Sequence, residues 1–117
     1  HEDLANIDDS KIGHPTPVGM YPRGATPSGI CDLSGNLWEW TQSLWGADLM
    51  PPDFKYPYDA NDGRENINAS DGVPRVLRGG SWIFSSRDAR CACRSRDDPG
   101  FRGLNIGFRI IVSLAFR

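Results

Sequence analysis

The 117-residue chain predicts an α+β fold that is rich in loops, with short strands and little helix. Thirteen Gly and nine Pro residues interrupt the chain too often for long helices. The apolar segments between them are short, as is typical of strands separated by turns. Four Trp residues supply large apolar surfaces for one core. We therefore expect a single domain over residues 1–117.

The first clear strand signal is the sequence NLWEWT, residues 36–41. Trp38 and Trp40 are two residues apart, so they would share one face of an extended segment. Leu37, Glu39 and Thr41 would then occupy the opposite face. Because large aromatic side chains usually pack inside, we expect the Trp face to belong to the core rather than to bind a ligand.

A long surface loop is predicted over residues 46–74, which contain Pro, Asp, Asn and Gly without a sustained period. Phe54, Tyr56 and Tyr58 alternate within this loop. They either hold the loop on the body of the domain or stay exposed for binding, and holding the loop is the favoured interpretation.

Three further strands are predicted after the loop. RVLRGGSW, residues 75–82, indicates a strand that ends in a Gly-Gly bend, and NIGFRIIVSLAF, residues 105–116, indicates a closing strand. Between them, ARCACRSR alternates strictly and predicts a strand over residues 89–96. One face would carry Arg90, Ala92, Arg94 and Arg96, and the other Ala89, Cys91, Cys93 and Ser95. The arginine side chains are either solvated or lie over the core with their guanidinium groups near carboxylates such as Glu39 or Asp32.

Charge and cysteine content exclude several classes of function. A net charge of -2 and a pI near 5.6 lack the cationic excess that nucleic-acid binding needs, so we expect no nucleic-acid partner. No apolar run approaches the ~20 residues of a membrane span, and the start, HEDLANIDDS, lacks the regions of a signal peptide, so the compartment stays open.

Cys31, Cys91 and Cys93 form neither a complete disulfide set nor a zinc pattern with His1 and His14. We interpret them as buried or incidental thiols.

Four ordered motifs, TPVG, DLSGNLWEWT, RVLRGGSW and NIGFR, resemble the formylglycine-generating-enzyme/sulfatase-modifying-factor family from about Ala5 to Val112. The resemblance implies a C-type-lectin-like fold. It also implies that the chain corresponds to the C-terminal part of a typical member. Activity has to be argued residue by residue, because one fold hosts several functions.

The catalytic residues of the enzymes in this family are not reproduced. In formylglycine-generating enzymes a catalytic cysteine pair follows Gly-Gly-Ser-aromatic, where this chain has Ile83, Phe84, Ser85 and Ser86. Cys91 and Cys93 match a later family segment in which the cysteine is not catalytic. The related iron-dependent sulfoxide synthases need an upstream histidine cluster, which His1 and His14 do not form. We therefore expect a protein without catalytic residues.

Calcium is the one cofactor that the resemblance implies, because some members bind it at two sites. The matching residues are Asn6 and Ile7 for the first site, and Ser34, Gly35, Leu37 and Glu39 for the second. Carbonyl oxygens of a tight turn together with a carboxylate suit a hard cation. The acidic ligand expected at the first site falls on Ser10, beside Asp8 and Asp9. The alternative is that these are ordinary turn residues.

A second branch of this fold family consists of the variable proteins of diversity-generating retroelements. There, adenine-directed mutagenesis of Asn codons yields many residue types but never Lys, Glu, Gln, Met or Trp. None of these five occurs from Ile83 to Phe108, whereas they occur twelve times elsewhere in the chain. The segment between the GGSW and NIGFR borders therefore has the composition of a diversified surface.

These observations predict a non-catalytic protein that displays a variable ligand-binding face to an unknown protein or surface ligand. Ile83, Phe84, Phe101 and Leu104 would be apolar anchors, and Asp88, Asp97 and Asp98 polar specificity groups. The predicted face consists of Ile83, Phe84, Ser85, Ser86, Asp88, Ala89, Cys91, Cys93, Ser95, Asp97, Asp98, Gly100, Phe101, Gly103 and Leu104. The alternatives are a formylglycine-generating or related oxidase, a non-catalytic sensor or regulatory module, and a paralogue whose loop has drifted.

Overall fold

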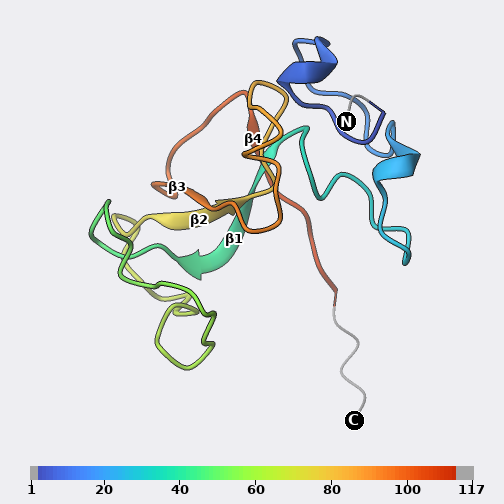
Figure 1. Ribbon diagram of the computed structural model, residues 1–117. Coiled ribbons are helices and arrows are strands. Elements are labelled where there is room, and N and C mark those ends of the chain that lie inside the picture. Colours follow the sequence, from blue (N-terminus) through green and yellow to red (C-terminus); the bar gives the residue numbers. More distant parts are fainter. Residues whose placement is uncertain (1–2, 113–117) are drawn as a thin grey trace.

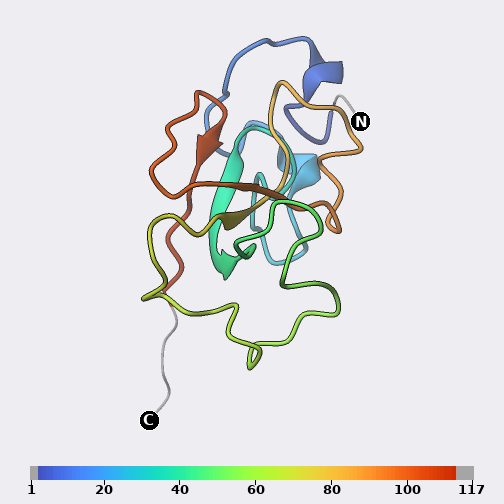
Figure 2. The ribbon, with the colours of Figure 1, turned by 90° about the vertical axis from the view of Figure 1, so that its left-hand side faces the viewer.

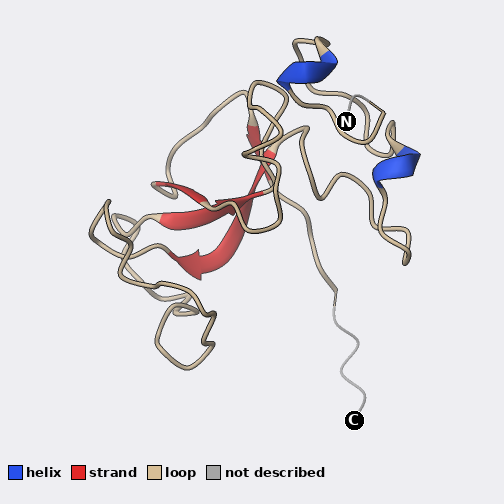
Figure 3. Ribbon diagram, in the orientation of Figure 1, coloured by secondary structure: helices blue, strands red, loops and turns tan. Residues whose placement is uncertain are grey.

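The structure, a computed structural model, describes residues 3–112 and consists mainly of loops (Figure 3). Within this range there is no α-helix, so the helical part of the predicted α+β class is limited to two single-turn 3-10 helices. No helix in the same range is long and apolar enough to cross a membrane. The expectation of a loop-rich domain with short strands is confirmed. Its elements are η1 (Asp8–Ser10), η2 (Pro22–Gly24), β1 (Trp38–Leu44), β2 (Arg75–Arg78), β3 (Ser95–Asp97) and β4 (Ile106–Gly107).

The four strands form one sheet in the order β3-β2-β1-β4 (Figure 1). β2 runs antiparallel to both β1 and β3, whereas β4 pairs parallel with the start of β1, where Trp38 lies opposite Ile106. The register between β1 and β2 shifts between Trp40 and Leu44, and such an irregularity increases the local bend of a strand. The sheet is consequently small and strongly curved.

The core contains the residues of β1 and β2 that face the N-terminal segment and the loops. Trp38 has an exposed fraction of 4%, which confirms its predicted place in the core, while Trp40 is only half-buried. Trp45, which directly follows β1, is buried as well although the sequence pattern did not single it out. The buried apolar residues are Ala5, Ile7, Tyr21, Trp38, Leu44, Trp45, Val76 and Leu77.

The predicted strand over residues 89–96 is wrong for most of its length, because only Ser95–Asp97 form β3. Ser95 pairs with Leu77, so the next position along the pairing would place Arg94 against Arg78, the last residue of β2. Beyond it lies Gly79, whose φ of 96° turns the chain away and removes the partner strand. The alternation of ARCACRSR therefore does not sort its side chains onto two faces of a sheet.

The closing strand is also shorter than predicted, since β4 contains only Ile106–Gly107 and residues 108–112 form no strand. The rest of the predicted strand lies outside the described residues. Each of the two interpretations of the alternating arginines holds for part of the set, because Arg90 is exposed whereas Arg94 and Arg96 are half-buried. The guanidinium carbons of Arg94 and Arg96 lie 5.0 Å and 5.3 Å from the Trp45 ring centroid, so these side chains cover the core. Glu39 instead pairs with Arg109.

The predicted loop over residues 46–74 is confirmed, and it projects from one end of the sheet (Figure 1). Phe54 is half-buried, while Tyr56 and Tyr58 each have an exposed fraction of 56%. The loop is organised around Arg64, whose guanidinium lies 4.9 Å from the Tyr58 ring centroid and 5.9 Å from that of Phe54. Arg64 itself is almost completely buried.

Candidate ligand-binding surface

The Gly-Gly-Ser-Trp border of the predicted variable face requires its glycines. Gly80 has a φ of 74°, and a Cβ atom there would lie 2.9 Å from the backbone nitrogen of Ala89. Any side chain at this position would therefore be strained and would collide with the backbone. Ser81 is fully buried, and its Oγ accepts a hydrogen bond of 3.4 Å from the side chain of Asn105, which belongs to the NIGFR border. The two borders thus meet in space.

A buried polar hub, defined as Asn6, Thr16 and Asn36, holds the first border in place. The Asn36 Oδ1 accepts from the backbone nitrogen of Thr16 at 2.9 Å, and the Asn36 Nδ2 donates to the Thr16 carbonyl at 3.1 Å. The backbone nitrogen of Asn36 donates to the Asn6 carbonyl at 2.7 Å. The Asn36 carbonyl then accepts from the backbone nitrogen of Trp82 at 3.0 Å. The hub therefore links the N-terminal segment to the start of the predicted face.

The backbone of the segment from Ile83 to Leu104 is also held by groups outside it. The Phe84 carbonyl accepts a hydrogen bond of 3.0 Å from the backbone nitrogen of Asp8. The Arg78 guanidinium donates to the carbonyls of Cys91 and Cys93, the latter at 2.9 Å. β3 adds the ladder with β2. The path of the segment is thus fixed mainly through its main chain.

The side chains of the predicted face, in contrast, remain accessible, and none of them is buried. Ile83, Phe101 and Leu104 have exposed fractions of 46%, 47% and 89%. Phe84 is an intermediate case, because it is 38% exposed and its ring meets Trp38 edge-on at a centroid distance of 5.8 Å.

The structure arranges these residues along a band rather than around one cavity. Ser86 and Ala89 line a cavity of about 420 Å³ together with residues of the N-terminal segment that include Ile7. Asp97 and Asp98 line a separate hollow of about 210 Å³ beside the loop over residues 46–74. β3 and β4 occupy opposite edges of the sheet, and the connection between them passes across it (Figure 2).

The three cysteines are free thiols. Cys91 is exposed, while Cys31 and Cys93 are half-buried. The four positions that directly follow Gly-Gly-Ser-Trp, residues 83–86, contain no thiol. Over residues 3–112, no three or more His, Cys, Asp or Glu side chains come together as potential metal ligands.

The two regions for which calcium was predicted lie next to each other, since the Asn6 carbonyl receives the hydrogen bond from Asn36 in the turn of the second region. In the first region, the Asn6 Oδ1 is buried and receives no hydrogen bond, so this one oxygen fits a hard cation. In the second, Glu39 accepts from the Arg109 Nε at 2.6 Å and from its Nη2 at 2.5 Å. This hydrogen bonding to Glu39 raises the pKa of Arg109 above its ordinary value. Calcium at Glu39 would have to displace this ion pair.

The family model described as Sulfatase-modifying factor enzyme 1-like domain matches residues 1–114. The serine/threonine-protein kinase pkn1 of Chlamydia caviae is 39% identical over 94 residues, which are 80% of this chain and 14% of the kinase. A hercynine oxygenase of Mycolicibacterium thermoresistibile is 36% identical over 114 residues, which are 92% of this chain and 23% of the oxygenase.

Among solved structures, Treponema denticola variable protein 1 has a similar fold. The TM-score is 0.60, with 24% sequence identity, over 92% of this chain and 35% of that chain. The formylglycine-generating enzyme of Mus musculus is 27% identical over 91% of this chain and 26% of the enzyme. This chain therefore spans about a quarter or less of the length of the curated relatives described here.

Proposed function

Because this chain belongs to the family of Sulfatase-modifying factor enzyme 1-like domains, whose fold is C-type-lectin-like, we propose that it is a non-catalytic ligand-binding protein with a diversified surface. The surface is formed by the segment from Ile83 to Leu104. One observation carries the proposal: the backbone of this segment is held by outside groups, while the side chains of the predicted face positions are not buried. Such positions can change without loss of the fold.

The composition of the segment supports the same function. Lys, Glu, Gln, Met and Trp are absent from Ile83 to Phe108, as adenine-directed mutagenesis of Asn codons requires. The fold shared with Treponema denticola variable protein 1 is compatible with such a use of the scaffold.

The partner that fits this surface is a protein or another surface ligand. Ile83, Phe101 and Leu104 offer exposed apolar groups, which are the usual anchors of protein interfaces. Asp97 and Asp98 lie shortly before Phe101 in the sequence and add negative charge. With a net charge of -2 overall, the chain has little electrostatic attraction for nucleic acid.

A tolerance experiment tests the proposal directly. The accessible positions Ile83, Phe101 and Leu104 are randomised to the residue types that mutated Asn codons can yield, and folded variants are selected by resistance to protease. We expect most variants to remain folded, whereas the same randomisation at the buried residues Val76 and Leu77 should abolish folding. Equal loss at both sets would contradict the proposal. Sequencing of the neighbouring DNA for a repeat of the segment beside a reverse transcriptase gene tests the origin of the diversity.

A related oxidase is the second candidate, and the similarity to hercynine oxygenases favours it. Against it stands the stretch Ile83–Ser86, which lacks the thiols that the formylglycine-generating enzymes use. Turnover of a cysteine-containing sulfatase peptide, or of hercynine with iron and a thiol, by this chain would support the oxidase. The Chlamydia kinases favour a third candidate, a regulatory module, because the similar region is a small part of each kinase.

We further propose calcium at the Asn6 and Ile7 region, on the basis of the buried Asn6 Oδ1 that receives no hydrogen bond. A calcium titration should shift the NMR signals of the Asn6 side-chain amide with saturation, and magnesium at equal concentration should not. Shifts confined to the signals of Glu39 and Arg109 would instead assign the ion to the second region.

A further inference from the structure

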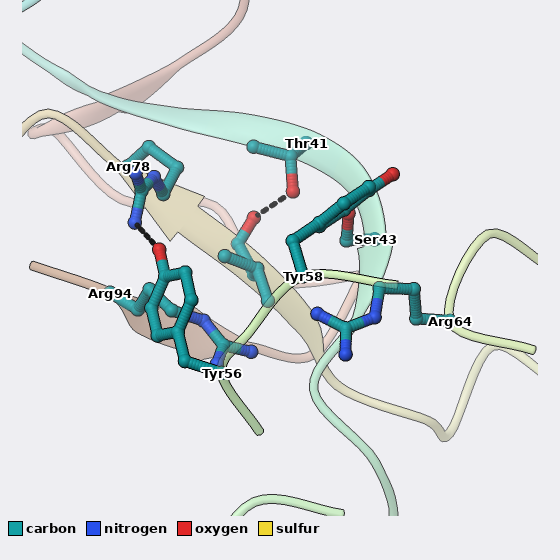
Figure 4. A pocket seen from close by; sticks show the side chains of 8 residues that line it. Thr41, Ser43, Tyr56, Tyr58, Arg64, Arg78 and Arg94 are labelled. Carbon is teal, nitrogen blue, oxygen red and sulfur yellow. Dashed lines mark hydrogen bonds between the residues drawn. The ribbon is translucent and has the colours of Figure 1, made fainter. Parts of the chain in front are cut away.

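A pocket outside the predicted variable face lies between the sheet and the loop over residues 46–74 (Figure 4). Its volume is about 300 Å³, within the usual range for small-ligand sites. β1 and β2 form its floor, and Tyr56 and Tyr58 stand at its opening, where each is 56% exposed. The lining residues are Thr41, Ser43, Tyr56, Tyr58, Arg64, Val76, Arg78 and Arg94.

One end of the pocket is electrostatically balanced. The Arg64 Nε donates to both carboxylate oxygens of Asp62, and Nη2 donates to the Asp62 Oδ2 and to the Lys55 carbonyl, the latter at 2.9 Å. Ser43 donates to the carboxylate of Glu65 at this end. The Asp62 carboxylate therefore neutralises the Arg64 guanidinium, and the Glu65 carboxylate is held by Ser43.

The other end carries positive charge without a carboxylate. Arg78 donates to the carbonyls of Cys91 and Cys93 and to the Tyr56 hydroxyl, the last at 3.0 Å. Arg94 makes a single hydrogen bond, from its Nη2 to the Phe54 carbonyl at 3.0 Å. No acidic side chain within residues 3–112 forms an ion pair with either arginine.

Aromatic rings hold the Arg94 guanidinium in place. Its carbon lies 5.0 Å from the Trp45 ring centroid and 5.2 Å from that of Tyr56. Burial lowers the pKa of Arg94, and the nearby charges of Arg64 and Arg78 lower it further against the opposing effect of Tyr56. A guanidinium has five N–H donors, so Arg94 has donors left over for an acceptor. It is therefore a fixed cation without a counterion.

We propose that this pocket binds a carboxylate carried by a small aromatic body. The free part of the Arg94 guanidinium matches the two oxygens of one carboxylate, because the planar fork pairs with them bidentately. The rings of Tyr56 and Tyr58 and the side chain of Val76 offer apolar contacts for the attached body. This inference goes beyond the proposed variable surface and does not depend on it. Arg94 lies within the segment from Ile83 to Leu104, but neither it nor any other lining residue is one of the predicted face positions.

Benzoate is the probe, and benzamide is its neutral isostere. Binding is followed through the indole N–H signal of Trp45, whose Nε1 donates to the Leu49 carbonyl at 3.2 Å and whose ring touches Arg94. We expect benzoate to shift this signal with saturation and to bind at least about tenfold more tightly than benzamide. Equal affinity for the two probes, or the absence of saturable binding by benzoate, would overturn the proposal. This comparison uses the unmodified protein, so no variant has to fold.

A pair of arginine variants locates the site. Arg94→Gln should weaken benzoate binding about tenfold or more, because it removes the unpaired cation. Arg96→Gln is the matched control, since Arg96 also stacks on Trp45 but does not line the pocket. It makes the same charge change and should alter affinity less than about twofold. Equal weakening by both variants would overturn the assignment of the site to this pocket.

Two further probes identify the ligand class. Inorganic phosphate tests a different anion, and N-acetylglutamate amide presents a carboxylate as it occurs on an acidic side chain of a protein. Weaker binding of both than of benzoate supports a small aromatic acid. Tighter binding of phosphate than of benzoate would overturn the assignment of a carboxylate ligand. Tighter binding of the glutamate probe than of benzoate would overturn the assignment of an aromatic body to that ligand.

Discussion

The buried polar hub and the segment from Ile83 to Leu104 are both held by hydrogen bonds, but through opposite parts of their residues. In the hub, the Asn36 side chain bonds both the backbone nitrogen and the carbonyl of Thr16. In the segment, the bonds reach main-chain atoms, such as the carbonyls of Phe84 and Cys91. The side chain of a hub residue is therefore required for these bonds, whereas the bonds that hold Phe84 and Cys91 do not depend on their side chains.

This difference would allow one domain to combine a constant region with the changeable region proposed above. The donors that hold the segment, the backbone of Asp8 and the side chain of Arg78, lie outside it. Replacement of a side chain within the segment leaves these donors and the carbonyls that they bind intact. Positions where a side chain contacts a core residue, such as Phe84 beside Trp38, should then be the exceptions.

The largest effect is expected for Trp38→Ala, which should unfold the domain. Trp38 is 4% exposed, and removal of a large buried aromatic side chain costs about 3 to 5 kcal/mol. Phe84→Ala should cost about 1 kcal/mol, the scale of an aromatic pair, and Phe101→Ala less. Circular dichroism melts of the three variants measure this order. Destabilisation by Phe84→Ala as large as that by Trp38→Ala would show that the segment is part of the core.

The next largest effect is expected for Asn36→Ala. The substitution removes the hydrogen bonds to Thr16 and places Ala at a φ of 63°. We expect a loss of about 3 kcal/mol in the free energy of unfolding, because buried groups of Thr16 and Asn6 lose their partners. Asn68→Ala, at an exposed position of the long loop, is the control. It should change the free energy of unfolding by less than ~0.5 kcal/mol. Equal urea midpoints for the two variants would contradict the role of the hub.

The two regions also differ in how far the sequence predicts them. Gly80 and Trp38 were predictable because a bend and a core face follow from local residue types. The strand over residues 89–96 was not, since alternation alone does not supply a neighbour to pair with. β2 ends at Arg78, so only Ser95–Asp97 pair with it.

Long-range partners of charged side chains were the least predictable feature. Glu39 was one candidate partner for the alternating arginines, but its partner is Arg109, 70 residues away. Sequence spacing carries no information on such a choice, which depends on the path of the closing segment past β1. Arg64 was missed for a similar reason, because charged residues in Gly- and Asn-rich loops are usually solvated.

A pH-dependent effect is expected in the long loop, which resembles the hub because the buried Arg64 side chain holds it. Hydrogen bonds from Arg64 keep the pKa of Asp62 below its ordinary value of 3.8. The stability from this pair is therefore present above that value and is lost as the pH falls through the lower pKa of the folded state. Asp62→Asn should lower the Tm at pH 7. The difference in Tm between this variant and the wild type should shrink when the pH falls below the ordinary Asp pKa of 3.8. Asn61→Ala in the same loop is the control, and a pH-independent difference for Asp62→Asn would contradict the ion pair.

The smallest effect is expected for the double variant Cys91→Ser, Cys93→Ser. Both thiols are free, and the hydrogen bonds from Arg78 go to the carbonyl oxygens of these residues, which serine retains. The free energy of unfolding from urea titration should change by no more than ~0.5 kcal/mol. Arg78→Gln is the informative partner variant, because it removes the donor and leaves both thiols, and it should destabilise the domain more. A loss above ~3 kcal/mol for the cysteine variant, the scale of a core or disulfide change, would mean that side chains hold this segment as they hold the hub.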